Sequence, residues 1–193
     1  MKNSFLIICI LLVCLSCGQD PVPKPHAYLR LEFPEPNYNK FQDSLPFTFD
    51  KNDLVSKVET KIIPGATESY GLTLEYAPLK GSIYLTYKNV NQNKENLIAY
   101  LQDAQRFTQE HTRKADEIVE QPYINNNRKV YGMLYEIGGN AASQSQFYVT
   151  DSTEHFLTGS LYFYTKPNYD SIYPAAKYLE RDIKQIMESI AWK

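Results

Sequence analysis

The stretch Tyr70-Gly-Leu-Thr-Leu-Glu-Tyr76 and its continuation Ile83-Tyr-Leu-Thr-Tyr87 decide the fold of this chain. Apolar residues occupy every second position of the first segment, and the second segment alternates in the same way. A period of two is typical of a β-strand with one buried face. Residues 78–81, which begin with proline and end with glycine, separate the segments, so we predict an antiparallel hairpin.

Similar strand patterns lie on both sides of this hairpin. Pro122 follows one of them, and we expect it to interrupt that strand because proline has no N–H to donate. The polar turn between the last two strands predicts a β-meander. The further strands are predicted over residues 27–33, 47–49, 54–63, 115–121, 129–137, 146–150 and 156–164.

Two segments have the period of an α-helix instead. Residues 94–114 carry an apolar stripe, with Asp103 and Arg106 on the opposite, solvent-facing side. Residues 171–189 carry a second stripe, and Trp192 is expected to pack back on the domain. The two stripes are Leu97, Leu101, Ala104, Phe107 and His111 in the first helix, and Ile172, Ala176, Leu179, Ile183, Ile186 and Ile190 around the second.

The order strands, helix, strands, helix predicts an α+β domain with a single antiparallel β-sheet and two main helices packed on it. This architecture resembles the Mog1/PsbP-like sandwich. We expect one domain over residues 27–193.

The N-terminus has the features of a lipoprotein signal peptide. An apolar run over residues 5–15 follows Lys2, and it is too short to span a bilayer as a helix. Ser16-Cys17 follows, so we expect removal of residues 1–16 and lipidation of Cys17; an ordinary secretory signal cut nearby is the alternative. Two or more fatty chains, such as palmitate, would anchor the protein stably. Residues 17–26 are rich in proline and predict an extended tether.

Composition excludes several function classes. The 193 residues carry 20 basic and 22 acidic side chains without a basic block, which disfavours nucleic-acid binding. Cys9 and Cys14 lie in the signal peptide, so the mature domain has no disulfide and no free thiol. The 16 tyrosines indicate half-buried sheet positions or, alternatively, a surface that docks another protein.

The residues with catalytic potential are few. His26, His111 and His155 lack the spacing of a metal site, so no metal and no cofactor is expected. Asp151, Ser152 and His155 are the residue types of a hydrolase triad, but a polar turn explains them more simply. The glycine-rich segment 138–143 lacks the lysine of a phosphate-binding loop and indicates a flexible connection.

Several stretches resemble the GldD family of gliding motility lipoproteins. The resemblance covers nearly the whole mature chain, is most specific after residue 110 and is weaker over residues 54–81. Its stretches are Pro23-Lys-Pro-His-Ala-Tyr-Leu-Arg-Leu-Glu-Phe-Pro-Glu-Pro36, His111-Thr-Arg-Lys-Ala-Asp116, Val130-Tyr-Gly-Met-Leu-Tyr-Glu-Ile-Gly-Gly-Asn-Ala-Ala-Ser143, Gln146-Phe-Tyr-Val-Thr-Asp-Ser-Thr-Glu-His-Phe-Leu157, Gly159-Ser-Leu-Tyr-Phe163, Lys166-Pro-Asn-Tyr-Asp-Ser171 and Trp192-Lys193.

The resemblance implies a non-catalytic envelope lipoprotein needed for gliding motility and for the type IX secretion system. Its partners would be other gliding and secretion proteins, and its place the periplasmic face of the outer membrane. The residues expected to contact a partner, if these motifs are not simply structural, are His111, Arg113, Lys114, Asp116, Asp151, Ser152 and His155. Two alternatives remain: a lipid-anchored module that binds a small molecule or glycan in an aromatic pocket, and an envelope hydrolase.

Overall fold

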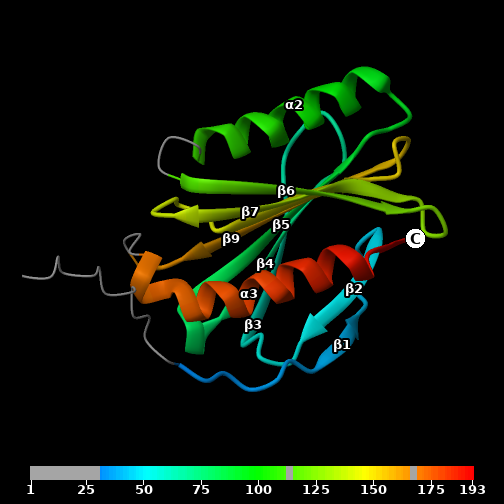
Figure 1. Ribbon diagram of the computed structural model, residues 1–193. Coiled ribbons are helices and arrows are strands. Elements are labelled where there is room, and N and C mark those ends of the chain that lie inside the picture. Colours follow the sequence, from blue (N-terminus) through cyan, green and yellow to red (C-terminus); the bar gives the residue numbers. More distant parts are fainter. Residues whose placement is uncertain (1–30, 112–114, 166–168) are drawn as a thin grey trace, which may run out of the picture.

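The computed structural model describes residues 31–111, 115–165 and 169–193, except for the side chains of residues 107, 110 and 111. The chain is α+β, as predicted (Figure 1). Its strands are β1 (Tyr38–Phe41), β2 (Phe47–Asn52), β3 (Lys57–Ile62), β4 (Ser69–Tyr76), β5 (Gly81–Asn89), β6 (Ala115–Asn125), β7 (Val130–Gly139), β8 (Ser145–Thr150), β9 (His155–Phe163) and β10 (Ala191–Trp192). Its helices are α2 (Lys94–His111), α3 (Tyr169–Ser189) and the 3₁₀ turn η1 (Ala77–Leu79).

Seven strands form one antiparallel sheet in the order β3-β4-β5-β9-β8-β7-β6. The predicted hairpin is its β4–β5 pair, in which Tyr76 lies opposite Gly81. The turn η1 joins these strands, and Lys80 closes it in the left-handed conformation with φ of 50°. The predicted meander is confirmed as the β7-β8-β9 part of the sheet.

The two helices cover opposite faces of this sheet (Figure 1). Helix α3 contributes the main apolar contacts, because Leu179, Ile183 and Ile186 of its predicted stripe are fully buried. They pack with Leu74, Ile83, Leu85, Leu157 and Leu161 of the sheet in one core. Helix α2 lies on the other face and contributes one buried side chain among those described, Thr108.

The prediction of a single sheet was wrong. Strand β2 pairs with β1 along one edge and with β10 along the other, so both of its edges are occupied and it cannot join the larger sheet. The result is a second sheet in the order β1-β2-β10. Phe47 and Phe49 of β2 are buried in the main core, where Phe47 stacks on Tyr87 of the large sheet.

A buried carboxylate attaches the small sheet to α3. Asp182 is fully buried and accepts hydrogen bonds from the Tyr38 hydroxyl at 2.6 Å and from Asn52 Nδ2 at 2.8 Å. Burial, opposed by these hydrogen bonds, raises the pKa of Asp182 above its ordinary value. Asn52 Nδ2 also lies 3.2 Å from the Tyr178 hydroxyl, so one polar network joins β1, β2 and α3.

Three further predictions need correction. No strand forms over the described part of the predicted 27–33 segment, residues 31–33. Strand β6 continues through Pro122 to Asn125, because β6 is an edge strand and its outer N–H groups have no ladder partner. Helix α3 begins at Tyr169, before the predicted residue 171, and Asn140 Oδ1 of a distant loop accepts a hydrogen bond from the Tyr169 N–H at 3.0 Å.

Within the described residues, no helix is both long enough and apolar enough to cross a membrane. The signal peptide, Cys17 and the tether over residues 17–26 lie outside the described residues.

Candidate functional site

A cavity of about 410 Å³ lies between α2 and the sheet. It exists because the middle of this sheet face carries short side chains, Thr86 on β5 and Thr158 and Ser160 on β9. The apolar residues of the same strands point to the opposite face, since neighbouring side chains of a strand alternate. Helix α2 spans the short side chains without filling the space above them.

The strand register places the cavity residues in a row across four strands. Tyr84 lies opposite Ser160, Ser160 opposite Gln146, and Gln146 opposite Tyr135. Two tyrosines therefore flank a hydroxyl and a carboxamide. Further aromatic rings line the cavity: Tyr100, Tyr148, Phe156 and Tyr162.

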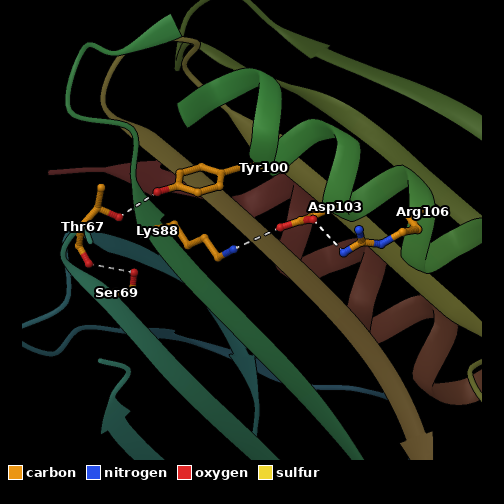
Figure 2. A network of polar contacts seen from close by, with 6 residues as sticks. All are labelled: Thr67, Ser69, Lys88, Tyr100, Asp103 and Arg106. Atoms are coloured by element: carbon orange, nitrogen blue, oxygen red, sulfur yellow. Dashed lines mark hydrogen bonds and ion pairs between the residues drawn. The ribbon is translucent and has the colours of Figure 1, made fainter. Parts of the chain in front are cut away.

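Polar contacts fix α2 over the sheet (Figure 2). The Tyr100 hydroxyl lies 2.8 Å from Thr67 Oγ1, in the loop before β4. The Tyr100 ring packs against Phe156 with ring centroids 5.6 Å apart, and Lys88 Nζ lies 4.6 Å from the centre of the Tyr100 ring. These contacts hold α2, which forms the roof of the cavity, above the sheet residues that form its floor.

Two cations at the cavity edge, Lys88 and Arg106, share one carboxylate, that of Asp103. Asp103 Oδ2 lies 3.8 Å from Lys88 Nζ, and Asp103 Oδ1 accepts a hydrogen bond from Arg106 Nη2 at 2.9 Å (Figure 2). Asp103 and Arg106 were predicted on the solvent-facing side of the helix, and both are exposed while lining the cavity. Such exposed ion pairs stabilise a fold only slightly.

Three tyrosine hydroxyls of the cavity, those of Tyr84, Tyr135 and Tyr148, stay protonated at neutral pH because their pKa values are raised. Burial raises the pKa of Tyr135 to about 12, and the neighbouring Tyr148 and Glu120 add to this shift. Burial also raises the pKa of Tyr84 and of Tyr148. These groups can therefore donate hydrogen bonds to a ligand but cannot act as general bases there.

Gln146 is the more deeply buried of two buried polar residues that line the cavity, the other being Thr108, and its exposed fraction is 3 %. Its Oε1 accepts a hydrogen bond from Thr108 Oγ1 of α2 at 3.2 Å. Its Nε2 is buried and has no hydrogen-bond partner among the described residues. Thr108 has one hydroxyl proton and also bonds to Ala104 O at 3.1 Å, so the amide can equally be turned over, with Gln146 Nε2 donating to Thr108 Oγ1. In that orientation Gln146 Oε1 takes the position without a partner, so one polar atom of the amide is unpaired either way.

The residues Asp151, Ser152 and His155 lie in the β8–β9 turn, and none of them lines this cavity. Asp151 Oδ1 accepts hydrogen bonds from the N–H groups of Thr153, Glu154 and His155 at 2.8–3.0 Å. Burial raises the pKa of Asp151, but these N–H groups outweigh it and lower the pKa overall. The carboxylate thus holds the turn, as the simpler prediction had it.

His155 is committed to contacts inside the domain. Its Nδ1 lies 2.9 Å from the Tyr87 hydroxyl, and its ring stacks on Trp192 at 4.9 Å between centroids. Ser152 is exposed and has a φ of 71°. Asp151 and His155 thus make contacts that stabilise the turn and pack it against the domain. This geometry does not support the hydrolase alternative.

Of the other predicted contact residues, Asp116 lies in a described strand, at the end of the sheet away from the β8–β9 turn. Asp116 is exposed at the start of β6, where Ala115 pairs with Gly139. Arg113 and Lys114 lie outside the described residues, and so does the side chain of His111, the last residue of α2. The described contact residues therefore fall into two groups, one at the end of α2 and the start of β6 and the other in the β8–β9 turn.

The segment 138–143 is not the flexible connection that its glycines indicated. Ala141 and Ser143 are buried, and the buried Gln144 donates from Nε2 to Ala141 O at 2.8 Å. No cluster of three or more histidine, cysteine or acidic side chains within the described parts of the chain has the arrangement of a metal site.

Fold and sequence together define a class of protein: an α+β domain that follows a predicted lipoprotein signal and carries a polar aromatic cavity. Its Asp151, Ser152 and His155 belong to an ordered turn and do not form a triad. The family model described as gliding motility lipoprotein GldD matches residues 18–192, so the chain belongs to the GldD family. Membership makes it a membrane-anchored lipoprotein of the cell envelope that serves gliding motility. No curated protein and no solved structure matches, and the likeness to the Mog1/PsbP-like sandwich stays a prediction.

Sequence reasoning missed the cavity residues, although their signal was present. The positions that alternate with the core residues of β5 and β9 are hydroxyl-bearing or aromatic, at 84 and 86 and at 156, 158, 160 and 162. A solvated sheet face usually carries charged residues at such positions. Short hydroxyl side chains between tyrosines were therefore the sequence signal that could have indicated a cavity on this face of the sheet.

Proposed function

We propose that this chain is a non-catalytic scaffold that assembles or stabilises the gliding machinery and the type IX secretion system by protein–protein contact. The observation that carries the proposal is the family match, which extends over residues 18–192 and thus over the whole described fold. The arrangement of Asp151 and His155 supports it, because their polar groups are used inside the domain.

The proposed partner contacts are the exposed residues of the two groups, Asp116 at one end of the sheet and Ser152 at the other. Arg113, Lys114 and the side chain of His111 belong to the first group by sequence. The partners are other gliding and secretion proteins of the envelope. In the proposed arrangement, the lipid on Cys17 anchors the protein in the outer membrane. The domain lies beyond its tether on the periplasmic side.

Deletion of the gene tests the function. We expect a clean deletion to abolish both gliding and display of secreted adhesins, and a plasmid copy to restore both. Normal gliding in the deletion strain would reject the proposal.

Site-specific crosslinking tests the contact surfaces in the native envelope. A photoreactive residue at Asp116 or at Ser152 should capture a protein whose own deletion stops gliding. The same residue at Lys57, which is exposed on the distant edge strand β3, should not capture it. Equal capture from all three positions would contradict specific contact at these sites.

A further inference from the structure

The cavity under α2 combines features that point to a ligand. Its volume of about 410 Å³ falls within the range of about 300–1,000 Å³ that is usual for small-molecule sites. Its floor includes Gln146, whose exposed fraction is 3 % and whose Nε2 has no partner among the described residues. An unpaired buried amide group is costly, and a ligand that carries a hydrogen-bonding oxygen would remove that cost.

The lining matches one kind of ligand chemistry. Hydroxyl groups of Thr86, Thr158 and Ser160 line the same cavity as the Gln146 amide, and Ser160 lies directly opposite Gln146. Tyr84 and Tyr135 stand at the two ends of the row. Aromatic rings offer flat apolar faces, and hydroxyl and amide groups offer hydrogen bonds in both directions. A sugar ring has both complements, apolar C–H faces and a rim of hydroxyl groups.

Other ligand classes fit less well. A fatty acyl chain would leave the Gln146 amide and the threonine hydroxyls of the floor without partners, which is unfavourable in a buried site. A phosphate needs concentrated positive charge, but Asp103 already lies 3.8 Å from Lys88 Nζ and 2.9 Å from Arg106 Nη2.

We propose that the cavity between α2 and the sheet binds a neutral carbohydrate of one or two sugar rings. In this site the Gln146 amide hydrogen-bonds to a ring substituent, and Tyr84 and Tyr135 contact the faces of the sugar. The proposal goes beyond the scaffold function and does not rest on it, since binding is measured on the purified protein.

Calorimetric titration of the purified full-length lipoprotein in detergent tests the proposal. The probes are glucose, galactose, mannose, N-acetylglucosamine and N,N′-diacetylchitobiose at millimolar concentrations, with octanoate and pyrophosphate as contrasting ligands. We expect at least one sugar to bind saturably. Absence of sugar binding, with or without binding of octanoate or pyrophosphate, overturns the proposal.

Variants locate the binding to the cavity. Gln146→Leu should weaken sugar binding about tenfold, the loss expected for one hydrogen bond. Thr158→Tyr should abolish it by filling the floor. Gln121→Leu is the matched control, because Gln121 bonds to Glu136 on the opposite face of the sheet, and it should bind sugar within about twofold of the wild type.

Circular dichroism identifies variants that have lost the fold. If Gln146→Leu does not fold, Tyr84→Ala takes its place, since Tyr84 is 38 % exposed and its loss leaves the core intact. Tyr84→Ala should also weaken binding about tenfold. Unchanged sugar affinity in the folded cavity variants would place the binding elsewhere and overturn the proposal.

Discussion

At the scale of single residues, glycine makes possible the close approach of β7 and β8. A Cβ atom added at Gly132 would lie 1.9 Å from the carbonyl oxygen of Tyr148, which is a backbone atom and cannot turn aside. Gly132 lies opposite Val149 in this strand pair, next to the strand that carries Gln146. The close pairing of β7 and β8, which supports both the cavity floor and the core, therefore requires glycine at position 132.

We predict that Gly132→Ala lowers the free energy of unfolding by at least about 2 kcal/mol, the usual cost of overpacking. Gly65→Ala is the control, because the nearest atom to its added Cβ is 3.7 Å away and its φ is not left-handed. Urea denaturation of both variants measures the difference. Equal stability of the two variants would contradict the steric argument.

His155 gives the domain a dependence on pH. Burial lowers its pKa below the ordinary value of 6.5, although Asp151 and Glu154 act in the opposite direction. The unfolded chain therefore binds a proton more readily than the folded one between that lowered pKa and 6.5. The contribution of His155 to stability is complete above pH 6.5 and is lost as the pH falls through this window.

Between about pH 7.5 and about pH 5.5, we expect acidification to lower the free energy of unfolding of the wild type relative to that of His155→Phe, which keeps a ring beside Trp192 but cannot titrate. The raised pKa of Asp182 acts in the opposite direction in both proteins, so the comparison isolates His155. Urea denaturation at both pH values gives the comparison. The difference between the two slopes is informative even if the substitution lowers stability at every pH. An identical pH dependence in wild type and variant would show that His155 is not the group responsible.

At the scale of elements, the two helices are held very differently. Helix α3 buries seven side chains, including Leu179, Ile183 and Ile186, whereas α2 buries Thr108 alone among its described side chains. Polar contacts such as that between Tyr100 and Thr67 help to attach α2 to the sheet. An element with few buried apolar contacts opens at a low free energy.

Hydrogen exchange should therefore distinguish the helices. We predict that backbone amides in the middle of α2 exchange at least about tenfold faster than those of α3. Tyr100→Phe, which removes the hydroxyl bonded to Thr67, should speed exchange in α2 and leave α3 unchanged. Mass spectrometry of peptides from both helices measures this, and equal protection would show that α2 is held as firmly as α3.

At the scale of the whole molecule, the domain is one part of an anchored protein. The described fold begins at residue 31, and the proposed anchor Cys17 precedes it by a proline-rich segment. Each proline restricts the backbone, so a short tether of this composition favours an extended chain. The anchor would then decide where the domain works, while its surfaces and cavity decide what it contacts.

We predict that Cys17→Ser removes palmitate labelling and releases the protein from the membrane fraction, because the thiol that carries the lipid is absent. Cys14→Ser is the matched control: residue 14 lies in the predicted signal peptide, so the mature protein should stay labelled and membrane-bound. Fractionation with metabolic labelling gives the readout. Membrane retention of an unlabelled Cys17→Ser protein would contradict the anchor.

The sequence by itself determined the local elements and the family. Alternation over residues 70–76 predicted β4, and the stripe through Leu179 and Ile183 predicted the buried face of α3. These signals depend on neighbours within a few residues, which any strand or helix of such a sequence must arrange in the same way.

The tertiary structure alone decided which distant segments meet. It placed β2 between β1 and β10, made β6 an edge strand that tolerates Pro122, and turned the hydroxyl row of β9 toward α2 to form a cavity. Which strands pair with one another depends on the packing of the whole chain, and the hydrophobic periodicity of a single segment does not predict it. For that reason the sequence allowed an aromatic pocket for a glycan only as an alternative, and the place and residues of the cavity were not visible in it.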